Sequence, residues 1–419
     1  MTRFLYTLAL HALLPWAIFH LLWRGRRQPA YWRHWGERFG FYRQRPPKPV
    51  IWIHAVSVGE TRAAQPLVAA LRARYPEHHL LLTHMTPTGR ETSTDLFGDT
   101  VERVYLPYDL PWAVSAFLRR FRPVIGIVME TELWPNLVAA CQARHVPLVL
   151  VNARLSEKSA RRYARFPSLT RATLEKLAAI AAISTEDARR LQALGARDVA
   201  VNGNLKFDIA PPVGQPDFYG LIGQRPVFLC ASTREGEEAL LLDAWQKTGA
   251  SGAALLVIVP RHPQRFDEVA QLVRLRGLKL QRRSDGNPVG SDTQVWLGDS
   301  MGELFAYYAM ASRMGVAFVG GSLRDFGCQN LIEPCSVGAP VLIGPSTFNF
   351  ADAAQKALES GAARQCADAD ALVRGALTLL GDRDQRERMG AAGRAFAAQH
   401  RGATARTQAL IERFIPAAR

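Results

Sequence analysis

Cysteine is scarce in this chain, and the signature motifs of several common enzyme classes are missing. Five scattered cysteines occur among 419 residues, with no CxxC pair. This argues against a disulfide framework or a zinc site and fits a reducing compartment. No Walker A, GxSxG or HExxH sequence occurs, so the signatures of P-loop, serine-hydrolase and zincin sites are absent. No internal repeat or low-complexity tract is present either.

Acidic residues are outnumbered by basic ones. Lysine and arginine together number 52, aspartate and glutamate 37, and the formal net charge is +15. A polyanionic partner is therefore expected, and charge alone leaves nucleic acid, anionic lipid and phosphorylated substrates open. The chain also exceeds the length at which a single core stops growing, so two domains are expected.

The amino-terminal segment favours anionic lipid over nucleic acid. Residues 4–23 form a mostly apolar run without formal charge, about long enough to span hydrocarbon. Residues 24–48 follow with eight basic side chains, the single acid Glu37 and recurring tryptophan and tyrosine. This pattern predicts an anchor held at an anionic cytoplasmic leaflet, with no nucleic-acid partner. Spanning and interfacial placement both stay open, and the alternative is a buried first helix of a soluble domain.

From Val50 onward, short apolar runs alternate with helical patterns, which predicts parallel sheets covered by helices on both faces. The expected strands are 50–54, 79–84, 101–106, 124–129, 147–151 and 180–184, and then 226–231, 254–259, 294–297, 315–319 and 340–343. Ligands of such sheets bind beyond the carboxyl ends of the strands. Loop residues at those ends are therefore the candidates for chemistry.

A proline- and glycine-rich stretch without periodicity, residues 208–220, is typical of a linker. We therefore expect an anchor segment over 1–49, an α/β domain over 50–210 and a second α/β domain over 211–419, with a cleft between the domains. The basic helical pattern at about 384–415 is interpreted mainly as solvated surface, and its last helix is a candidate to cross back to the first domain.

Glu60 is the first candidate for catalysis. It follows an apolar strand pattern and Gly59, and it precedes a helical pattern. The dipole at the amino end of a helix favours an ionised carboxylate, and such a group can accept a proton at neutral pH. The alternative is that Glu60 only complements the helix terminus.

Two further acids and a lysine lie in the same half of the chain. Glu130 and Glu132 come directly after an expected strand, where two acids among apolar residues are unusual. Either of them alone is equally explained by a helix cap or a solvated side chain. Lys206, near the linker, can offset negative charge on a phosphate or leaving group, although a lone lysine is usually a surface residue.

The second half carries candidates for binding an anion. Arg261 follows an expected strand and suits a phosphate or carboxylate. The sequence GGS at 320–322 lets backbone amides approach an anion. Asn330 and Glu333 have the spacing of a capping box, and the amides at 301–303 open a helical pattern. The acidic triplet at 368–370, a DxD-like sequence with Asp368 and Asp370, is interpreted as the start of a surface helix rather than a metal site. Neither a metal nor a cofactor is expected.

Taken together, these segments resemble the 3-deoxy-D-manno-octulosonic acid (Kdo) transferases of Gram-negative bacteria. The matching segments run in order across nearly the whole chain: WRHWGERFG, HAVSVGE, THMTPTGRE, YLPYDLP, METELWPN, VNARLSEKS, NGNLKFD, VPRHPQRF, GDSMGELF, AFVGGS, QNLIEP and GPSTFNF. The resemblance implies a GT-B fold, with an acceptor domain followed by a CMP-Kdo domain. It also implies inverting, metal-independent transfer of Kdo to the lipid A precursor in lipopolysaccharide biosynthesis.

The resemblance also assigns roles to residues. Glu60 is the implied base, and Glu130 and Lys206 support the transition state. The implied CMP-binding residues are Pro260, Arg261, Met301, Gly302, Glu303, Asn330, Leu331, Ile332 and Glu333, with Ser322 near the donor sugar or phosphate. Two positions depart from the family pattern, because Gln329 and Ser346 replace histidines found in many relatives. The number of Kdo residues transferred stays open.

Two other functions compete with Kdo transfer. One is a GT-B transferase or epimerase that uses another nucleotide sugar, which competition between CMP and UDP would distinguish. The other is a basic membrane-surface binding protein without turnover.

Overall fold

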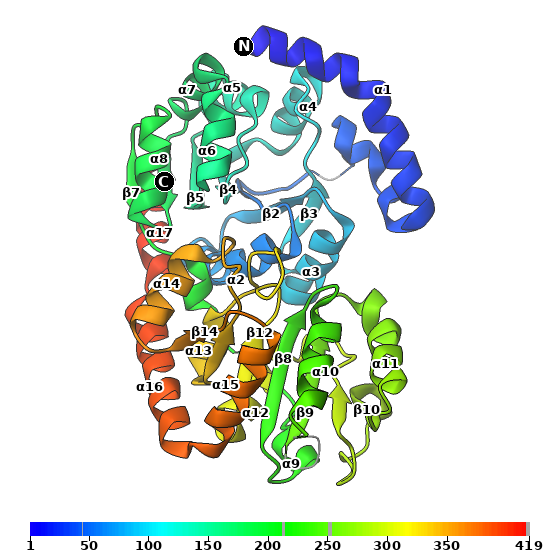
Figure 1. The fold of residues 1–419 in the computed structure, drawn as a ribbon. Coiled ribbons are helices and arrows are strands. Elements are labelled where there is room, and N and C mark those ends of the chain that lie inside the picture. Colours follow the sequence, from blue (N-terminus) through cyan, green and yellow to red (C-terminus); the bar gives the residue numbers. More distant parts are fainter. Residues whose placement is uncertain (44, 212–213, 250–253, 416–419) are drawn as a thin grey trace. The chain divides into compact units, whose positions relative to one another are not determined.

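The computed structural model describes residues 1–43, 45–211, 214–249 and 254–415. The chain forms two compact units. Unit 1 comprises Met1–Ile209 and Arg401–Arg419, and unit 2 comprises Ala210–His400. Each contains a seven-stranded sheet (Figure 1).

The sheet of unit 1 is parallel throughout, with the order β3-β2-β1-β4-β5-β6-β7. Its strands are β1 (Val50–His54), β2 (His79–His84), β3 (Glu102–Tyr105), β4 (Pro123–Met129), β5 (Leu148–Ala153), β6 (Ala179–Ala182) and β7 (Val199–Val201). Side chains alternate across the central strand β1, so Trp52 faces one core cluster while Ile51 and Ile53 face the other. Burial on both faces explains why this strand reads as a continuous apolar run.

Helices cover both faces of this sheet. They are α1 (Arg3–Arg27), α2 (Val58–Arg74), α3 (Pro87–Phe97), α4 (Pro111–Phe121), α5 (Pro135–Ala143), α6 (Glu157–Ala164), α7 (Pro167–Leu174), α8 (Thr185–Ala193) and α17 (Ala403–Glu412), with short 3-10 turns η1 (Pro29–Trp32), η2 (Trp35–Phe39), η3 (Gly98–Thr100) and η4 (Leu205–Asp208). Proline opens α3, α4, α5 and α7, where its missing N–H costs no helical hydrogen bond. Helices α4 and α5 contribute to the core cluster that contains Trp52, and α2 and α17 to the opposite one.

The C-terminal helix α17 belongs to unit 1. The Asp208 carboxylate accepts the amides of Gly402 (2.7 Å) and Thr404 (2.6 Å), which lie at the start of α17. Ile411 is fully buried against the sheet. The basic pattern expected at about 384–415 is therefore two helices, α16 (Arg383–Gln399) in unit 2 and α17 in unit 1.

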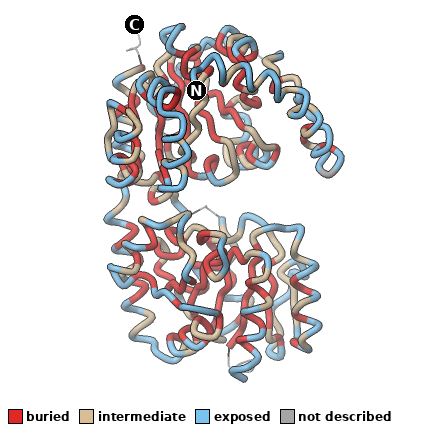
Figure 2. The backbone as a smooth tube through the Cα atoms, turned by 45° about the horizontal axis from the view of Figure 1, so that its top comes forward, coloured by how far each residue is buried: buried red, intermediate tan, exposed pale blue. Residues whose placement is uncertain are grey.

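Unit 2 has the parallel order β10-β11-β9-β8-β12-β13-β14. Its strands are β8 (Val227–Thr233), β9 (Leu255–Pro260), β10 (Leu280–Arg282), β11 (Val295–Leu297), β12 (Gly315–Val319), β13 (Val341–Ile343) and β14 (Ala363–Gln365). The remaining elements are α9 (Tyr219–Ile222), α10 (Glu237–Lys247), η6 (Pro263–Arg265), α11 (Phe266–Leu275), η7 (Arg283–Asp285), α12 (Leu304–Met314), α13 (Ile332–Val337), α14 (Ala351–Glu359) and α15 (Ala369–Gly381). Figure 2 shows buried segments of the chain running through the interior of each unit, with exposed segments around them.

The expected fold class of two doubly wound α/β sheets is confirmed, and every expected strand is present within two residues at each end. Strands β7, β10 and β14 were not expected. Each is three residues long, lies at or next to a sheet edge, and carries partly exposed residues. Strands β10 and β14 are mostly polar, and the three apolar residues of β7 are too few to form a recognisable run.

Helix α1 is exposed along most of its length. Residues 3–26 are long and apolar enough to cross a membrane by length and composition, and only 6% of the apolar window is buried. Two polar contacts near its start join it to the body of unit 1: the Tyr6 hydroxyl donates to Asp109 (3.0 Å), and the Thr7 hydroxyl donates to Asn136 (2.9 Å). Near its other end, Leu21 is buried. The alternative of a buried first helix is therefore wrong.

The Asp208 contacts predict a stability effect. The variant Asp208→Ala leaves two amides at the start of α17 without their acceptor and is expected to cost about 1–2 kcal/mol. Thermal unfolding of the purified chain measures it. The matched control is Asp198→Ala, which removes an exposed ion pair with Arg413 and should cost under about 0.5 kcal/mol. Equal losses in the two variants would contradict the capping role.

Candidate active site

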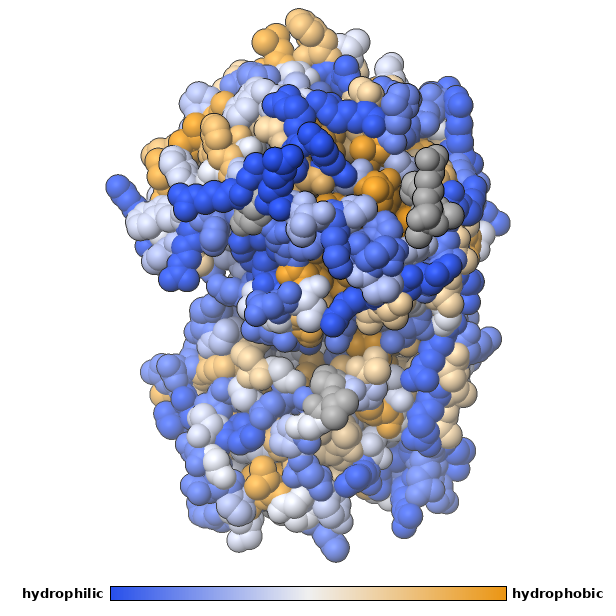
Figure 3. All heavy atoms as spheres, turned by 180° about the vertical axis from the view of Figure 1, so that it is seen from behind, coloured by the Kyte–Doolittle hydropathy of each residue, from blue (hydrophilic) through white to orange (hydrophobic). Residues whose placement is uncertain are grey.

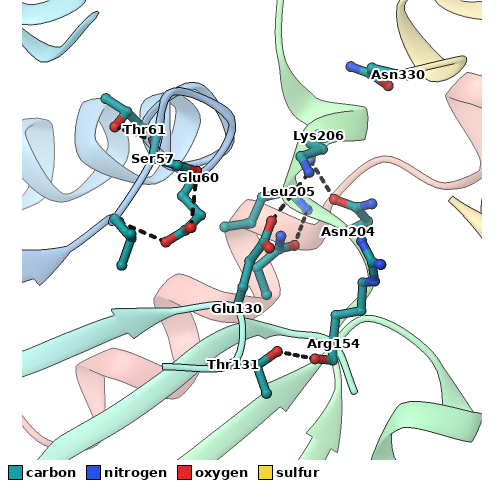
Figure 4. Close-up of polar contacts among 12 residues, drawn as sticks. Ser57, Glu60, Thr61, Glu130, Thr131, Arg154, Asn204, Leu205, Lys206 and Asn330 are labelled. Carbon is teal, nitrogen blue, oxygen red and sulfur yellow. Dashed lines mark hydrogen bonds and ion pairs between the residues drawn. The ribbon is translucent and has the colours of Figure 1, made fainter. Parts of the chain in front are cut away.

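Glu60 lies in the first turn of α2, just beyond the carboxyl end of β1. Its side chain is buried, and each carboxylate oxygen accepts one hydrogen bond. The amide of Val56 donates to Oε2 (2.8 Å), and the Ser57 hydroxyl donates to Oε1 (3.1 Å). Figure 4 shows both bonds. In the part of the chain that the structure describes, Glu60 makes no ion pair.

Burial decides the protonation of Glu60. Loss of solvent, followed by the nearby charge of Glu130, raises the pKa of Glu60 to about 8, although the bonds from Val56 and Ser57 oppose this rise. The sequence led us to expect that the helix dipole would favour the ionised form, but desolvation outweighs the dipole here. A carboxyl that titrates near neutral pH can take up and release a proton during turnover.

Glu130 and Lys206 form an ion pair in unit 1. The Lys206 Nζ lies 3.3 Å from Glu130 Oε1, and both side chains are only partly exposed. Glu130 directly follows β4 and has a positive φ of 56°, with its amide donating to Val151 O at 2.9 Å. A non-glycine residue in this region is strained, and such strain gathers at functional sites. The pair therefore combines two candidates that the sequence had left separate.

Two asparagines that we did not anticipate position Lys206. Asn204 Oδ1 accepts the amide of Lys206 (3.0 Å), and the buried Asn152 accepts the amide of Leu205 (3.0 Å). These bonds fix the 3-10 turn η4 that carries the lysine (Figure 4). Asn204 was visible in the sequence NGNLKFD, but the contribution of Asn152, from another strand, was not.

In unit 2, Arg261 directly follows Pro260 at the end of β9, as expected. Its backbone amide donates to Thr233 O (3.0 Å), and its Nε donates to Gln329 Oε1 (3.3 Å). The guanidinium is thus placed beyond the carboxyl ends of β8 and β9. Gln329, where the resemblance led us to expect histidine, contacts the arginine directly.

The glycine-rich turn after β12 is filled by a carboxylate of the protein itself. Glu237 is fully buried and accepts the amides of Arg234 (2.8 Å), Gly321 (2.7 Å) and Leu323 (2.9 Å). The sequence suggested that the amides of 320–322 would be available to a ligand anion, and for Gly321 this is wrong. Glu237 was missed because its role depends on contacts with residues more than 80 positions away.

Ser322 is also occupied within the protein. It is fully buried, its hydroxyl donates to Val319 O (2.6 Å), and it accepts the amide of Gly344 (2.9 Å). These bonds join the ends of β12 and β13. Its expected contact with the donor sugar or phosphate therefore gains no support, because the hydroxyl is fully buried and its proton is already donated to Val319 O.

The expected capping box at Asn330 and Glu333 forms in a different way. Asn330 Nδ2 donates to Glu333 Oε1 (2.9 Å), and Asn330 Oδ1 accepts the amide of Ile332 (3.1 Å). Glu333 therefore contacts a side chain rather than the backbone N–H of a true box. The side chains of Leu331 and Ile332 are buried, so any ligand contact from these two residues must come from their backbone.

Residues 301–303 precede a helix rather than form its first turn. Helix α12 begins at Leu304, Gly302 adopts a φ of 83°, and Met301 is exposed. The Glu303 carboxylate pairs with Arg283 (2.9 Å) and accepts the Ser300 hydroxyl. We expected residues 301–303 to form the first turn of the helix, and this is wrong, because α12 begins only after Glu303.

The acidic triplet has structural roles. Asp368 caps α15 by accepting the amide of Ala371 (2.7 Å), and Asp370 pairs with Lys247 (3.2 Å). Within the described ranges, no cluster of three or more potential metal-ligating side chains is found.

Comparison with known proteins places the chain in a family. A family model described as 3-Deoxy-D-manno-octulosonic-acid transferase (kdotransferase) matches residues 33–209. A 3-deoxy-D-manno-octulosonic acid transferase of Bordetella pertussis is 45% identical over 431 residues, covering 98% of this chain and 99% of the relative. One from Haemophilus influenzae is 37% identical over 426 residues, covering 99% of each. The chain belongs to the Kdo transferase family.

The fold of this Kdo transferase is GT-B-like. A crystal structure of a glycosyltransferase from Rickettsia africae aligns with a TM-score of 0.61 at 12% identity, covering 89% of this chain and 100% of that one. At this identity the likeness concerns the fold alone. The protein is therefore a glycosyltransferase by family and GT-B-like by architecture.

Gln329 and Ser346, where the resemblance led us to expect histidine, both make defined contacts in this Kdo transferase. Gln329 accepts from Arg261 Nε. Ser346 accepts the amide of Gly327 (3.1 Å) and donates to Asp325 (3.4 Å). Neither glutamine nor serine can carry a positive charge, so the charge beside Gln329 comes from Arg261.

The raised pKa of Glu60 predicts a pH-dependent stability. Because folding favours the protonated form, the contribution of this group is fully present below pH 4.5 and is lost as the pH rises to about 8. The uncharged variant Glu60→Gln avoids that loss and should be more stable than the parent above pH 8, by at least about 1 kcal/mol. Near pH 4.5 the difference should shrink.

Urea unfolding across this pH range measures the effect. The exposed Glu91→Gln is the matched control and should show no such trend. A stability difference that grew toward acid pH would contradict the assignment.

Proposed function

We propose that this Kdo transferase transfers Kdo from CMP-Kdo to the lipid A precursor, by a metal-independent inverting reaction with Glu60 as general base. The observation that carries the proposal is the buried Glu60 carboxyl, which titrates near neutral pH close to the Glu130–Lys206 pair. It sits in a chain related over its whole length to Kdo transferases.

The proposed reaction is a single displacement. The acceptor hydroxyl gives its proton to Glu60 as its oxygen forms a bond to the anomeric carbon of Kdo. The bond between that carbon and the phosphate oxygen breaks, and CMP leaves with the electron pair. Attack opposite the leaving group inverts the anomeric centre, and Lys206, held by Glu130, offsets negative charge that develops in the transition state.

The donor is assigned to unit 2. Arg261, with its Nε turned to Gln329, suits the CMP phosphate through its guanidinium. Glu333, held by Asn330, is proposed to accept the ribose hydroxyls. The proposed CMP-binding residues also include Pro260 and the backbone of 301–303 and 330–332. Ser322 is proposed to support the loops of this site through its bonds to Val319 and Gly344, without contacting the donor.

The acceptor and the location are assigned from unit 1. Helix α1 exposes large apolar side chains, which include Phe4, Leu8, Trp16 and Phe19. Because contacts near both ends hold α1 against unit 1, we favour a helix that lies in the membrane interface over one that spans it. The basic segment after it would attract anionic lipid and the phosphorylated acceptor at the cytoplasmic face of the inner membrane. On the face drawn in Figure 3, by contrast, hydrophilic side chains predominate.

The catalytic proposal predicts that Glu60→Gln loses transfer while binding is retained. Removing a general base should lower the rate by about 10²–10⁴-fold, with affinity for CMP unchanged because that site lies in unit 2. Mass spectrometry of lipid products formed from CMP-Kdo and the lipid A precursor measures the rate and counts the Kdo residues added. Near-normal transfer by a folded Glu60→Gln protein would refute the base assignment.

The location proposal predicts that α1 supports lipid binding. Replacing Phe4, Leu8 and Phe19 together with serine removes exposed apolar area, and should weaken co-sedimentation with anionic phospholipid vesicles about tenfold or more. The matched control is Leu275→Ser, an exposed apolar position of α11 in unit 2. Equal vesicle binding by the triple variant and the parent would contradict the role of α1.

A further inference from the structure

The 3-10 turn η2, in the basic segment that follows α1, carries a buried carboxylate that contacts β3 and α3 of unit 1. Glu37 is 5% exposed, although its segment is otherwise rich in exposed residues. Its Oε2 accepts the amide of Tyr105 (2.8 Å), at the end of β3, and Nη1 of Arg90 (2.7 Å), on α3. One carboxylate thus joins the segment that follows α1 to a strand end and to a helix.

The next residue holds the loop that follows β2. Arg38 is 2% exposed, and its Nη1 donates to the carbonyl of Met85 (3.0 Å). Its guanidinium lies 4.0 Å from the centre of the Tyr105 ring. Within the described residues, its Nε and Nη2 are buried without a hydrogen-bond partner. Burying a cation with unsatisfied N–H groups costs free energy. The hydrogen bond to Met85 and the contact with the Tyr105 ring offset part of this cost.

The loop that Arg38 holds grips the turn between β1 and α2. The Met85 amide (3.4 Å) and the Thr86 hydroxyl (3.1 Å) both donate to the carbonyl of Val56. Gly89 lies so close that an added Cβ would come within 3.0 Å of the same carbonyl oxygen. The turn therefore has little freedom to move away from the loop.

Val56 connects this grip to the proposed base. Its carbonyl is held by Met85 and Thr86, and its amide donates to Glu60. We propose that Glu37 and Arg38 are positioning residues for Glu60, acting through the loop after β2 and the Val56 turn. This inference rests on the proposed function, since it concerns the base of that reaction. It gives the segment that follows the membrane helix a role in catalysis as well as in attachment.

A purely structural role for Glu37 makes a different prediction. If Glu37 only fixes η2 to the rest of unit 1, its loss lowers the amount of folded enzyme and leaves the kcat of each folded molecule unchanged. If it positions Glu60, its loss loosens the Val56 turn and admits water to the carboxyl. Because burial is the main cause of the raised pKa of Glu60, the acid limb of the rate profile then moves to lower pH.

The test measures kcat and KM against pH for Glu37→Gln in the full chain. We expect kcat to fall about tenfold and the acid limb to shift to lower pH, with KM for both substrates and the affinity for CMP within about twofold of the parent. Arg38→Lys retains a charge but loses the planar fork, and should change kcat in the same direction. It also serves as the test if Glu37→Gln does not fold. Glu91→Gln, exposed on α3, is the control and should match the parent.

A double variant separates failure of this inference from failure of the proposed function. If Glu37 acts through Glu60, adding Glu37→Gln to Glu60→Gln should lower transfer no further. An unchanged acid limb in Glu37→Gln, or additive losses in the double variant, would overturn the positioning role and leave the base assignment intact. Normal transfer by Glu60→Gln alone would instead overturn the proposed function and this inference with it.

Discussion

The site in unit 1 depends on the balance of forces on one carboxyl group. Glu60 is removed from water at the start of α2, and only the Val56 amide and the Ser57 hydroxyl replace that water. Two neutral donors do not compensate the loss of solvent, so the proton is held to about pH 8. Had the group been exposed, the helix dipole would have kept it ionised with an ordinary, weakly basic oxygen. Had it paired with a lysine, its lone pairs would have been less available.

The lysine of the site is instead paired with a different acid. Lys206 forms an ion pair with Glu130. The site therefore contains a positive charge that is not paired with the Glu60 carboxylate. The strained backbone of Glu130, with its positive φ, is consistent with a position set by function more than by local preference. The two glutamates thereby have different chemical characters, because one is buried between neutral donors and the other faces a cation.

Carboxylates also organise the backbone elsewhere in the molecule. Glu237 accepts two amides of the turn after β12, Asp208 holds the start of α17, and Glu37 joins η2 to β3. In each case an acid accepts amides from segments far away in the sequence. A charged acceptor forms stronger bonds than a neutral one, which suits loops that have no sheet partners to satisfy their N–H groups.

Much of the architecture was predictable, because apolar runs of five or six residues between helical patterns leave a parallel sheet as the natural arrangement. The same patterns placed Glu60, Glu130 and Arg261 just beyond strand ends. Strands β7, β10 and β14 were not predicted because three residues are too few to establish an apolar run. Residue type and motif did not reveal that Ser322 hydrogen-bonds Val319 and Gly344 or that Glu303 pairs with Arg283, because the fold supplies these partners.

The sequence by itself determined the fold class, the order of the elements and the residue types available at each strand end, because local periodicity and turn composition encode these features. Only the tertiary structure decided the pKa of Glu60, the pairing of Lys206 with Glu130 and the filling of the glycine turn by Glu237. Desolvation and hydrogen bonding depend on which distant segments pack together. No local pattern records them.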